Sequence, residues 1–122
     1  MRKSYLPGIM ICLCSLGANL AWADQTVSKF LQTVEEPLGR ESAETFLAGI
    51  NSGFMQANSY LAQTRQESPI FCLPEQLALT NDQLLSLLKK GADEDPAMGD
   101  MTVPAALLAV MKNTFPCAAA PK

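Results

Sequence analysis

The chain has 122 residues, with 9 Lys and Arg, 12 Asp and Glu, and no histidine, which gives a net charge of −3 at pH 7. This length suits one domain with a modest core. The acidic balance argues against nucleic acid or an anionic membrane as a partner, because both repel a negative surface. The lack of histidine removes the commonest general base and the commonest zinc ligand.

The first 23 residues have the organisation of a cleaved signal peptide. Two basic residues near the start precede an apolar segment over residues 9–16, and Ala21-Trp22-Ala23 has the small residues of a cleavage site. The apolar segment is shorter than the roughly 20 residues that span a bilayer. We therefore expect export to the periplasm, cleavage after Ala23, and a single mature domain of residues 24–122 with no stable membrane anchor.

Lipidation is the competing interpretation of this segment, because it contains Cys12 and Cys14. The residues before them are Ile11 and Leu13, where a lipoprotein signal has a small residue, so we favour cleavage. Without residues 1–23, seven basic residues face twelve acidic residues, and the net charge becomes −5. That charge is compatible with a basic protein partner, although an acidic surface also serves solubility.

Two cysteines, Cys72 and Cys117, remain after the expected processing. In an oxidising compartment such a pair predicts one disulfide, with two free thiols as the alternative. For a loop of this length the chain-entropy estimate is about 4 kcal/mol. A domain of this size is stable by only about 5–15 kcal/mol, so the bond is expected to contribute a large share.

Apolar residues recur at helical spacing in the first half of the mature chain. The first helix is expected over about residues 27–34, ended by Pro37 and Gly39. The second is expected from about Ser42 to Leu61. It contains two glycines four positions apart, Gly49 and Gly53. Each costs about 1 kcal/mol relative to alanine, so we expect another backbone to pack closely there, with a bend as the alternative.

The second half predicts two more helices after a loop over residues 64–79. Thr80 and Gln83 form a capping-box pattern at the start of the third helix, and Gly91 is the expected stop. Thr102 is the expected cap of the fourth helix, which is apolar nearly all round and should be buried. No segment alternates as a strand does. The prediction is an all-α, four-helix domain closed by one disulfide.

Little in the chain suggests catalysis. The acidic clusters are Glu35–Glu36 and residues 93–95, and neither lies beside aromatic residues that could stack a sugar. The run at 93–95 also lacks the alternating ligand spacing of a calcium loop. We therefore expect no enzymatic activity, no metal and no cofactor, and a role in binding or structure.

Three blocks of sequence are more specific than the composition. They are the glycine-bearing segment 46–53, the block Phe71-Cys72-Leu73-Pro74 with residues 79–84 after it, and the closing Thr114-Phe115-Pro116-Cys117. Together they resemble the Rap/Tai family of immunity proteins, small exported helical proteins that neutralise peptidoglycan amidases delivered by type VI secretion. The resemblance covers roughly residues 43–117. Members often have a further cysteine pair near the glycine-bearing helix, and this chain has none there.

The resemblance implies a protein that binds an incoming amidase in the periplasm and blocks its Cys–His active-site cleft, and it makes a homodimer plausible. Phe71 and Phe115 are expected to pack beside the disulfide, where Pro74 and Pro116 would stiffen its flanks. Partner contacts are expected on an exposed acidic loop over residues 92–101. The candidate contact residues are Asp93, Glu94, Asp95 and Asp100.

The alternatives are a periplasmic acid-stress chaperone and a relative of the family that has a binding role other than immunity. Protonation of twelve acidic residues would supply the chaperone's response to low pH. These residues are not concentrated along the helix faces, and no motif supports a chaperone. An amidase gene beside the gene for this chain would favour immunity, whereas suppression of aggregation at low pH would favour a chaperone.

Overall fold

Helices α1 (Val27–Val34), α2 (Gly39–Tyr60), α3 (Asn81–Glu94) and α4 (Val103–Thr114) make up most of the chain in a computed structural model. A π-helical turn η2 (Leu61–Arg65) extends α2, and a 3-10 helix η3 (Pro96–Asp100) joins α3 to α4. The structure describes residues 24–65 and 67–118, so the expected signal peptide lies outside the described residues.

The described residues confirm the all-α prediction, with one disulfide between Cys72 and Cys117. Among these residues there is no strand, and the one β-bridge joins Thr26 to Thr102. No helix in the described part of the chain is both long enough and apolar enough to cross a membrane.

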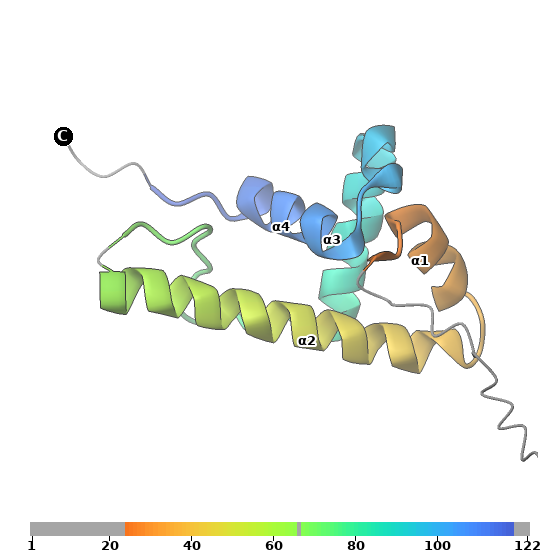
Figure 1. Cartoon of the computed structure of the whole chain (residues 1–122), viewed down its shortest axis with the longest axis horizontal. Helices are drawn as coiled ribbons and strands as arrows, with labels where there is room; N and C mark the ends of the chain where they lie inside the picture. Colours follow the sequence, from red (N-terminus) through yellow and green to blue (C-terminus); the bar gives the residue numbers. More distant parts are fainter. Residues whose placement is uncertain (1–23, 66, 119–122) are drawn as a thin grey trace, which may run out of the picture.

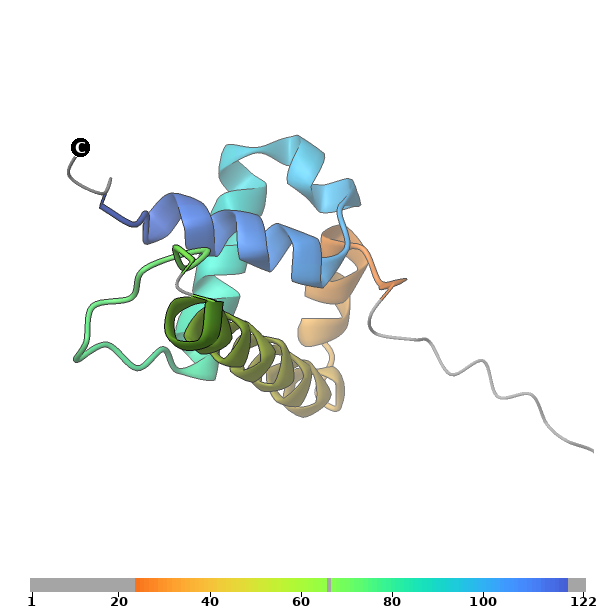
Figure 2. The ribbon, with the colours of Figure 1, turned by 60° about the vertical axis from the view of Figure 1, so that its left-hand side comes forward.

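α3 is the central helix of the arrangement. α2 and α4 each pack against it. Figures 1 and 2 show α2 crossing near the beginning of α3 and α4 crossing farther along it. α1 covers the beginning of α2 and also contacts α3, α4 and η3. α2 is the longest helix and extends past α3 on the side where the loop carrying Cys72 returns toward the end of α4.

The core forms where the apolar faces of the four helices meet. Burial of one large apolar side chain contributes about 1.5–3 kcal/mol, so this cluster is the main stabilising feature of the fold. α4 is largely buried between Ala105 and Met111, as its apolar composition predicts, with Ala105 the one exposed residue of that segment. The largest fully buried side chains are Phe30, Phe71, Leu47, Leu84, Leu88, Leu107, Met111, Val27 and Val103.

Two helix boundaries differ from the sequence-based prediction, and each involves a glycine. α2 begins at Gly39 rather than near Ser42. The chain passes so close to α1 there that a side chain at Gly39 would overlap the Thr33 carbonyl, which explains the glycine. α3 does not stop at Gly91 but continues to Glu94. Gly91 is buried inside the helix, where the missing side chain makes room for its neighbours.

The starts of α3 and α4 are held in different ways. The capping box of α3 is confirmed, since Gln83 N donates to Thr80 Oγ1 at 3.3 Å and Thr80 N donates to Gln83 Oε1 at 2.8 Å. Thr102 precedes α4 but makes no side-chain cap bond. Instead, Val103 N donates to the carbonyl of Gln25 at 3.1 Å, so the segment before α1 holds this helix start.

Candidate functional site

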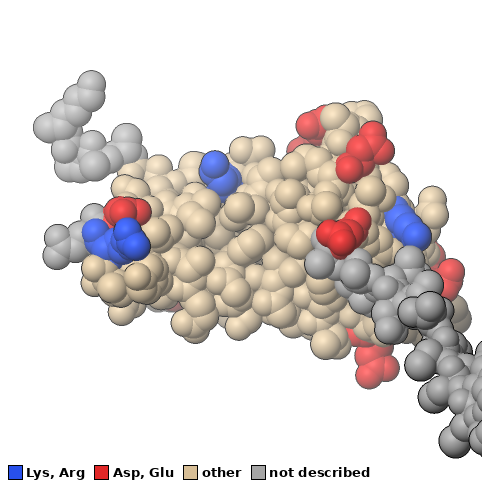
Figure 3. All heavy atoms as spheres, in the orientation of Figure 1, with Lys and Arg blue, Asp and Glu red and all other residues tan. Residues whose placement is uncertain are grey.

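The four predicted contact residues lie together at one end of the molecule, which we call the acidic end (Asp93, Glu94, Asp95 and Asp100). They do not form the expected loop. Asp93 and Glu94 are in the last turn of α3. Asp95 is the N-cap of η3, and Asp100 is its last residue. All four are exposed. Figure 3 shows red carboxylates gathered over this end of the surface.

Electrostatic attraction to a cation is the main property of the acidic end. No Lys or Arg occurs between Lys90 and Lys112 in the sequence. Lys90 Nζ lies 3.7 Å from Glu94 Oε1, so this one carboxylate is already paired. Asp93, Asp95 and Asp100 make no ion pair within the described residues, which leaves them to attract a basic partner.

The backbone beneath the acidic end is fixed by close packing. A Cβ on Gly91 would lie 2.5 Å from Val110 Cγ2 and 2.9 Å from Met98 Sδ, so the three residues are in tight contact. A Cβ on Gly99 would lie 2.6 Å from Ser28 Oγ of α1. Asp95 Oδ1 accepts a hydrogen bond from Ala97 N at 3.1 Å, which caps η3. The acidic end is therefore presented on a rigid support.

Two hollows adjoin along α3, and they share Leu87 and Lys90. The first, of about 160 Å³, reaches the acidic end at Glu94 and Asp95 and is bounded by α4. The second, of about 340 Å³, is more apolar. Its lining residues are Leu77, Leu79, Gln83, Ser86, Leu87, Lys90 and Phe115. We call the two hollows together the α3 trough.

The disulfide lies close in sequence to Phe115, a residue that lines the α3 trough. It joins Cys72, in the loop before α3, to Cys117, just after α4, and Cys72 N donates to the Phe115 carbonyl at 2.8 Å. Phe71 is buried, with its ring edge-on to Phe54 at 6.4 Å between centroids. Phe115 is half-buried, packs against the core and also lines the trough.

Pro74 and Pro116, the other two residues of these motifs, are exposed on either side of the disulfide. Their predicted role in stiffening the flanks of the disulfide stays a prediction.

The prediction of close packing at Gly49 and Gly53 was wrong for the described chain. A Cβ added to either glycine would meet nothing within 4 Å, and both residues lie on the exposed side of α2. The close approach is made by Gly91 instead. Glycine alone does not reveal which helix is approached, because its energetic cost is the same wherever the neighbour lies.

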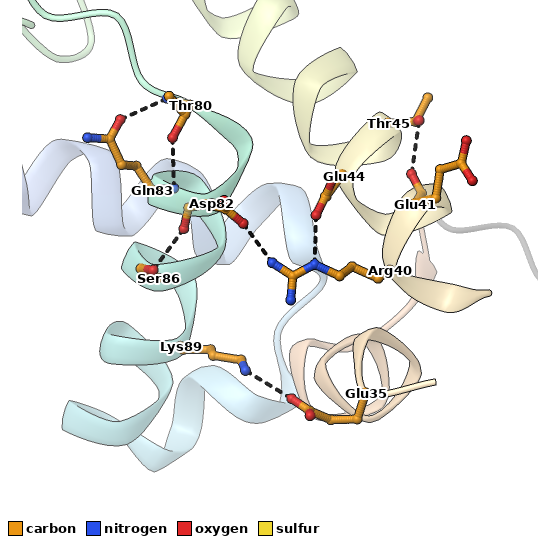
Figure 4. A network of polar contacts seen from close by, with 10 residues as sticks. All are labelled: Glu35, Arg40, Glu41, Glu44, Thr45, Thr80, Asp82, Gln83, Ser86 and Lys89. Atoms are coloured by element: carbon orange, nitrogen blue, oxygen red, sulfur yellow. Dashed lines mark hydrogen bonds and ion pairs between the residues drawn. The ribbon is translucent and has the colours of Figure 1, made fainter. Parts of the chain in front are cut away.

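Ion pairs connect α3 to the corner between α1 and α2 (Figure 4). Arg40 donates to Glu44 at 2.9 Å and to Asp82 at 2.7 Å, and these two hydrogen bonds raise the pKa of its guanidinium. Lys89 Nζ donates to Glu35 Oε1 at 3.0 Å. That hydrogen bond, together with the charge of Lys89, lowers the pKa of Glu35.

Asn58 is a structural residue that the sequence analysis did not single out. Its side chain accepts from Ile70 N at 2.8 Å and donates to the Phe71 carbonyl at 2.9 Å, so it fastens the disulfide loop to α2. A signal was present, since Asn58 follows Phe54 by one helical turn and is a polar residue on the predicted apolar stripe.

No group of three metal-binding side chains lies together within residues 24–65 and 67–118. Comparison with family models, curated proteins and solved structures finds no match to this chain.

Proposed function

We propose that this chain is a periplasmic immunity protein that binds and blocks a peptidoglycan amidase delivered by type VI secretion. The family resemblance of the blocks around Phe71–Pro74 and Thr114–Cys117 supports this proposal. In the structure both blocks meet at the disulfide, so they specify one local framework. Such an inhibitor carries out no reaction; it excludes substrate by occupying the entrance to the cleft.

The observation that carries the proposal is the acidic end. Three exposed carboxylates without an ion pair within the described residues stand on a backbone fixed by Gly91, Met98 and Gly99. A rigid charged surface loses little conformational entropy on binding. It also attracts a basic surface over about a Debye length, which speeds association and selects partners by charge. An amidase with a basic rim around its cleft fits this surface.

Binding of purified amidases tests the proposal. The mature, oxidised protein is mixed with each amidase encoded beside its gene or elsewhere in the genome, and affinity and peptidoglycan hydrolysis are measured. We expect one amidase to bind with a 1:1 ratio of subunits and to lose activity. A homodimer of this chain would appear in the same experiment as a complex of twice the expected mass.

A matched pair of variants tests the surface. Asp93→Asn with Asp100→Asn removes two carboxylates of the acidic end, and Glu36→Gln with Glu41→Gln removes two exposed carboxylates elsewhere. Exposed ion pairs contribute about 0.2–1 kcal/mol each, so the first variant should weaken binding by about 2- to 30-fold at low salt. The second should bind as the wild type does.

Unchanged affinity of the Asp93→Asn, Asp100→Asn variant at low salt would contradict the assignment of the surface. No binding to any amidase would contradict the immunity function itself. In that case, suppression of aggregation of unrelated proteins at low pH would support the chaperone alternative.

A further inference from the structure

The α3 trough continues the acidic end toward the disulfide. Its two hollows share Leu87 and Lys90, so a bound chain that touches Glu94 and Asp95 can pass along α3 to Phe115. The lining side chains change from charged to apolar along this path. The acidic end has carboxylates, and the far hollow has leucine side chains and one phenylalanine. A ligand that fits both parts has a basic group at one end and apolar groups at the other.

The far wall of the trough depends on the disulfide. Leu77 and Leu79 form that wall and belong to the loop that starts beyond Asn58 and carries Cys72. Phe115 lines the same hollow and is followed by Cys117 after one residue. The bond between the two cysteines therefore ties the loop that carries the leucines to the segment that carries Phe115.

Leu77 differs from the other apolar residues of the far hollow, because Leu79, Leu87 and Phe115 pack against the core. Among the loop residues, Phe71 is the one that belongs to the buried cluster, whereas the rest of the cluster lies in the helices and η3. Leu77 is half-buried and is not packed against the cluster. A change at Leu77 can therefore alter the trough without removing a core side chain.

Among the described residues, Lys90 is the one cation that lines the trough. It lies 3.7 Å from Glu94, so its charge is partly compensated within the protein. Asp95 also lines the near hollow and faces no basic side chain within hydrogen-bond distance in the described chain. The net charge of the side chains that line the near hollow is negative, so it favours a cationic side chain of a ligand there.

We infer that the α3 trough is the docking site for one segment of a protein partner, in which basic residues meet the acidic end and apolar residues enter the hollow of Leu77, Leu79 and Phe115. Charge complementarity at one end and apolar lining at the other select this occupant. If the proposed function holds, the segment belongs to the amidase. The trough itself is defined without reference to that function.

Three labelled synthetic peptides test the inference on the full oxidised protein. One has two arginines followed by leucine and phenylalanine, the second has glutamates in place of the arginines, and the third has serines in place of the apolar residues. We expect the first to bind at least tenfold more tightly than either of the others. Equal binding of the charge-reversed peptide would overturn the inference.

Two leucine variants locate the bound peptide. Leu77→Ser removes part of the apolar wall, and Leu38→Ser makes the same change at an exposed position in the connection between α1 and α2. Leu77→Ser should weaken binding of the first peptide at least fivefold, and Leu38→Ser should leave it unchanged. Equal effects of the two variants would place the peptide elsewhere and overturn the inference.

Replacement of both cysteines gives a further readout. Cys72→Ser with Cys117→Ser should keep the helical circular dichroism but lose at least fivefold in affinity for the first peptide, because the two walls are no longer joined. Unchanged affinity in a protein that is still folded would contradict the role of the disulfide. If this variant is unfolded, the Leu77→Ser result decides.

The failure of this inference is distinguishable from the failure of the proposed function. Peptide binding that depends on Leu77, without inhibition of any amidase, keeps the docking site and rejects the immunity function. Inhibition of an amidase that neither Leu77→Ser nor competition by the first peptide affects keeps the function and rejects the trough as its site.

Discussion

Glycine has opposite consequences at two positions of this chain. Gly49 is exposed with open space around it, so Gly49→Ala should raise the free energy of unfolding by about 0.5–1 kcal/mol through helix propensity. At Gly91 a new Cβ would lie 2.5 Å from Val110 Cγ2. Overpacking costs about 1–3 kcal/mol and outweighs the same propensity gain, so Gly91→Ala should lower stability by about 1 kcal/mol.

Urea denaturation of the two alanine variants checks this prediction. If the dependence of the unfolding free energy on urea concentration is unchanged, a shift of the midpoint from that of the wild type reports the change in stability. The variants serve as controls for each other, because the substitution is the same and both glycines lie inside helices. An increase in stability at Gly91 as large as that at Gly49 would show that Val110 and Met98 move aside freely.

Local chemistry explains which individual residues could be assigned from the sequence. The capping box of Thr80 and Gln83 was predictable because all its atoms lie within one turn of the chain. The role of Gly91 was not predictable in this way. Its neighbours Met98 and Val110 come from η3 and α4, so a stop signal and a close-packed interior position look the same in the sequence.

At the scale of elements, one side chain attaches the disulfide loop to α2. Asn58 makes two part-buried hydrogen bonds, to Ile70 N and the Phe71 carbonyl. Asn58→Ala leaves the Ile70 amide and the Phe71 carbonyl without their hydrogen-bond partner. Each lost hydrogen bond costs about 0.5–1.5 kcal/mol. We therefore expect a loss of about 1–3 kcal/mol in the free energy of unfolding.

Hydrogen exchange gives the specific test of the Asn58 prediction. The amide of Ile70 should lose protection in Asn58→Ala, whereas amides in the middle of α4 should lose only what the global change in stability explains. Gln56→Ala, an exposed substitution on the same helix, is the control and should change neither. Preserved protection at Ile70 would mean that the disulfide alone holds the loop.

The four acidic residues stood out in the sequence, but the arrangement of the surface around them did not. The run at 93–95 and Asp100 stood out as charge in the sequence, and the structure brings all four residues to one end. They were expected on a loop because Gly91 and Pro96 both signal a break. The trough beside them was not foreseen, since it needs α3, α4 and the disulfide loop together.

At the scale of the whole molecule, ion pairs that join distant segments make stability depend on pH. Lys89 of α3 donates to Glu35 after α1 and lowers the pKa of that carboxyl group. In the unfolded chain Glu35 takes up its proton at a higher pH than in the folded chain. The stabilisation is therefore complete above the unfolded-state pKa and is lost as the pH falls through the folded-state pKa.

Thermal unfolding of wild type and Glu35→Gln over a series of pH values follows this contribution. The variant should melt a few degrees or less below the wild type at neutral pH, because the pair is exposed, and the difference should close in acid. High salt should also reduce the difference, since it screens an exposed pair. Glu36→Gln, at the next position, is the control, because Glu36 makes no ion pair within the described residues. A difference between wild type and Glu35→Gln that stays constant through acid pH would show that the glutamate acts through packing rather than through its charge.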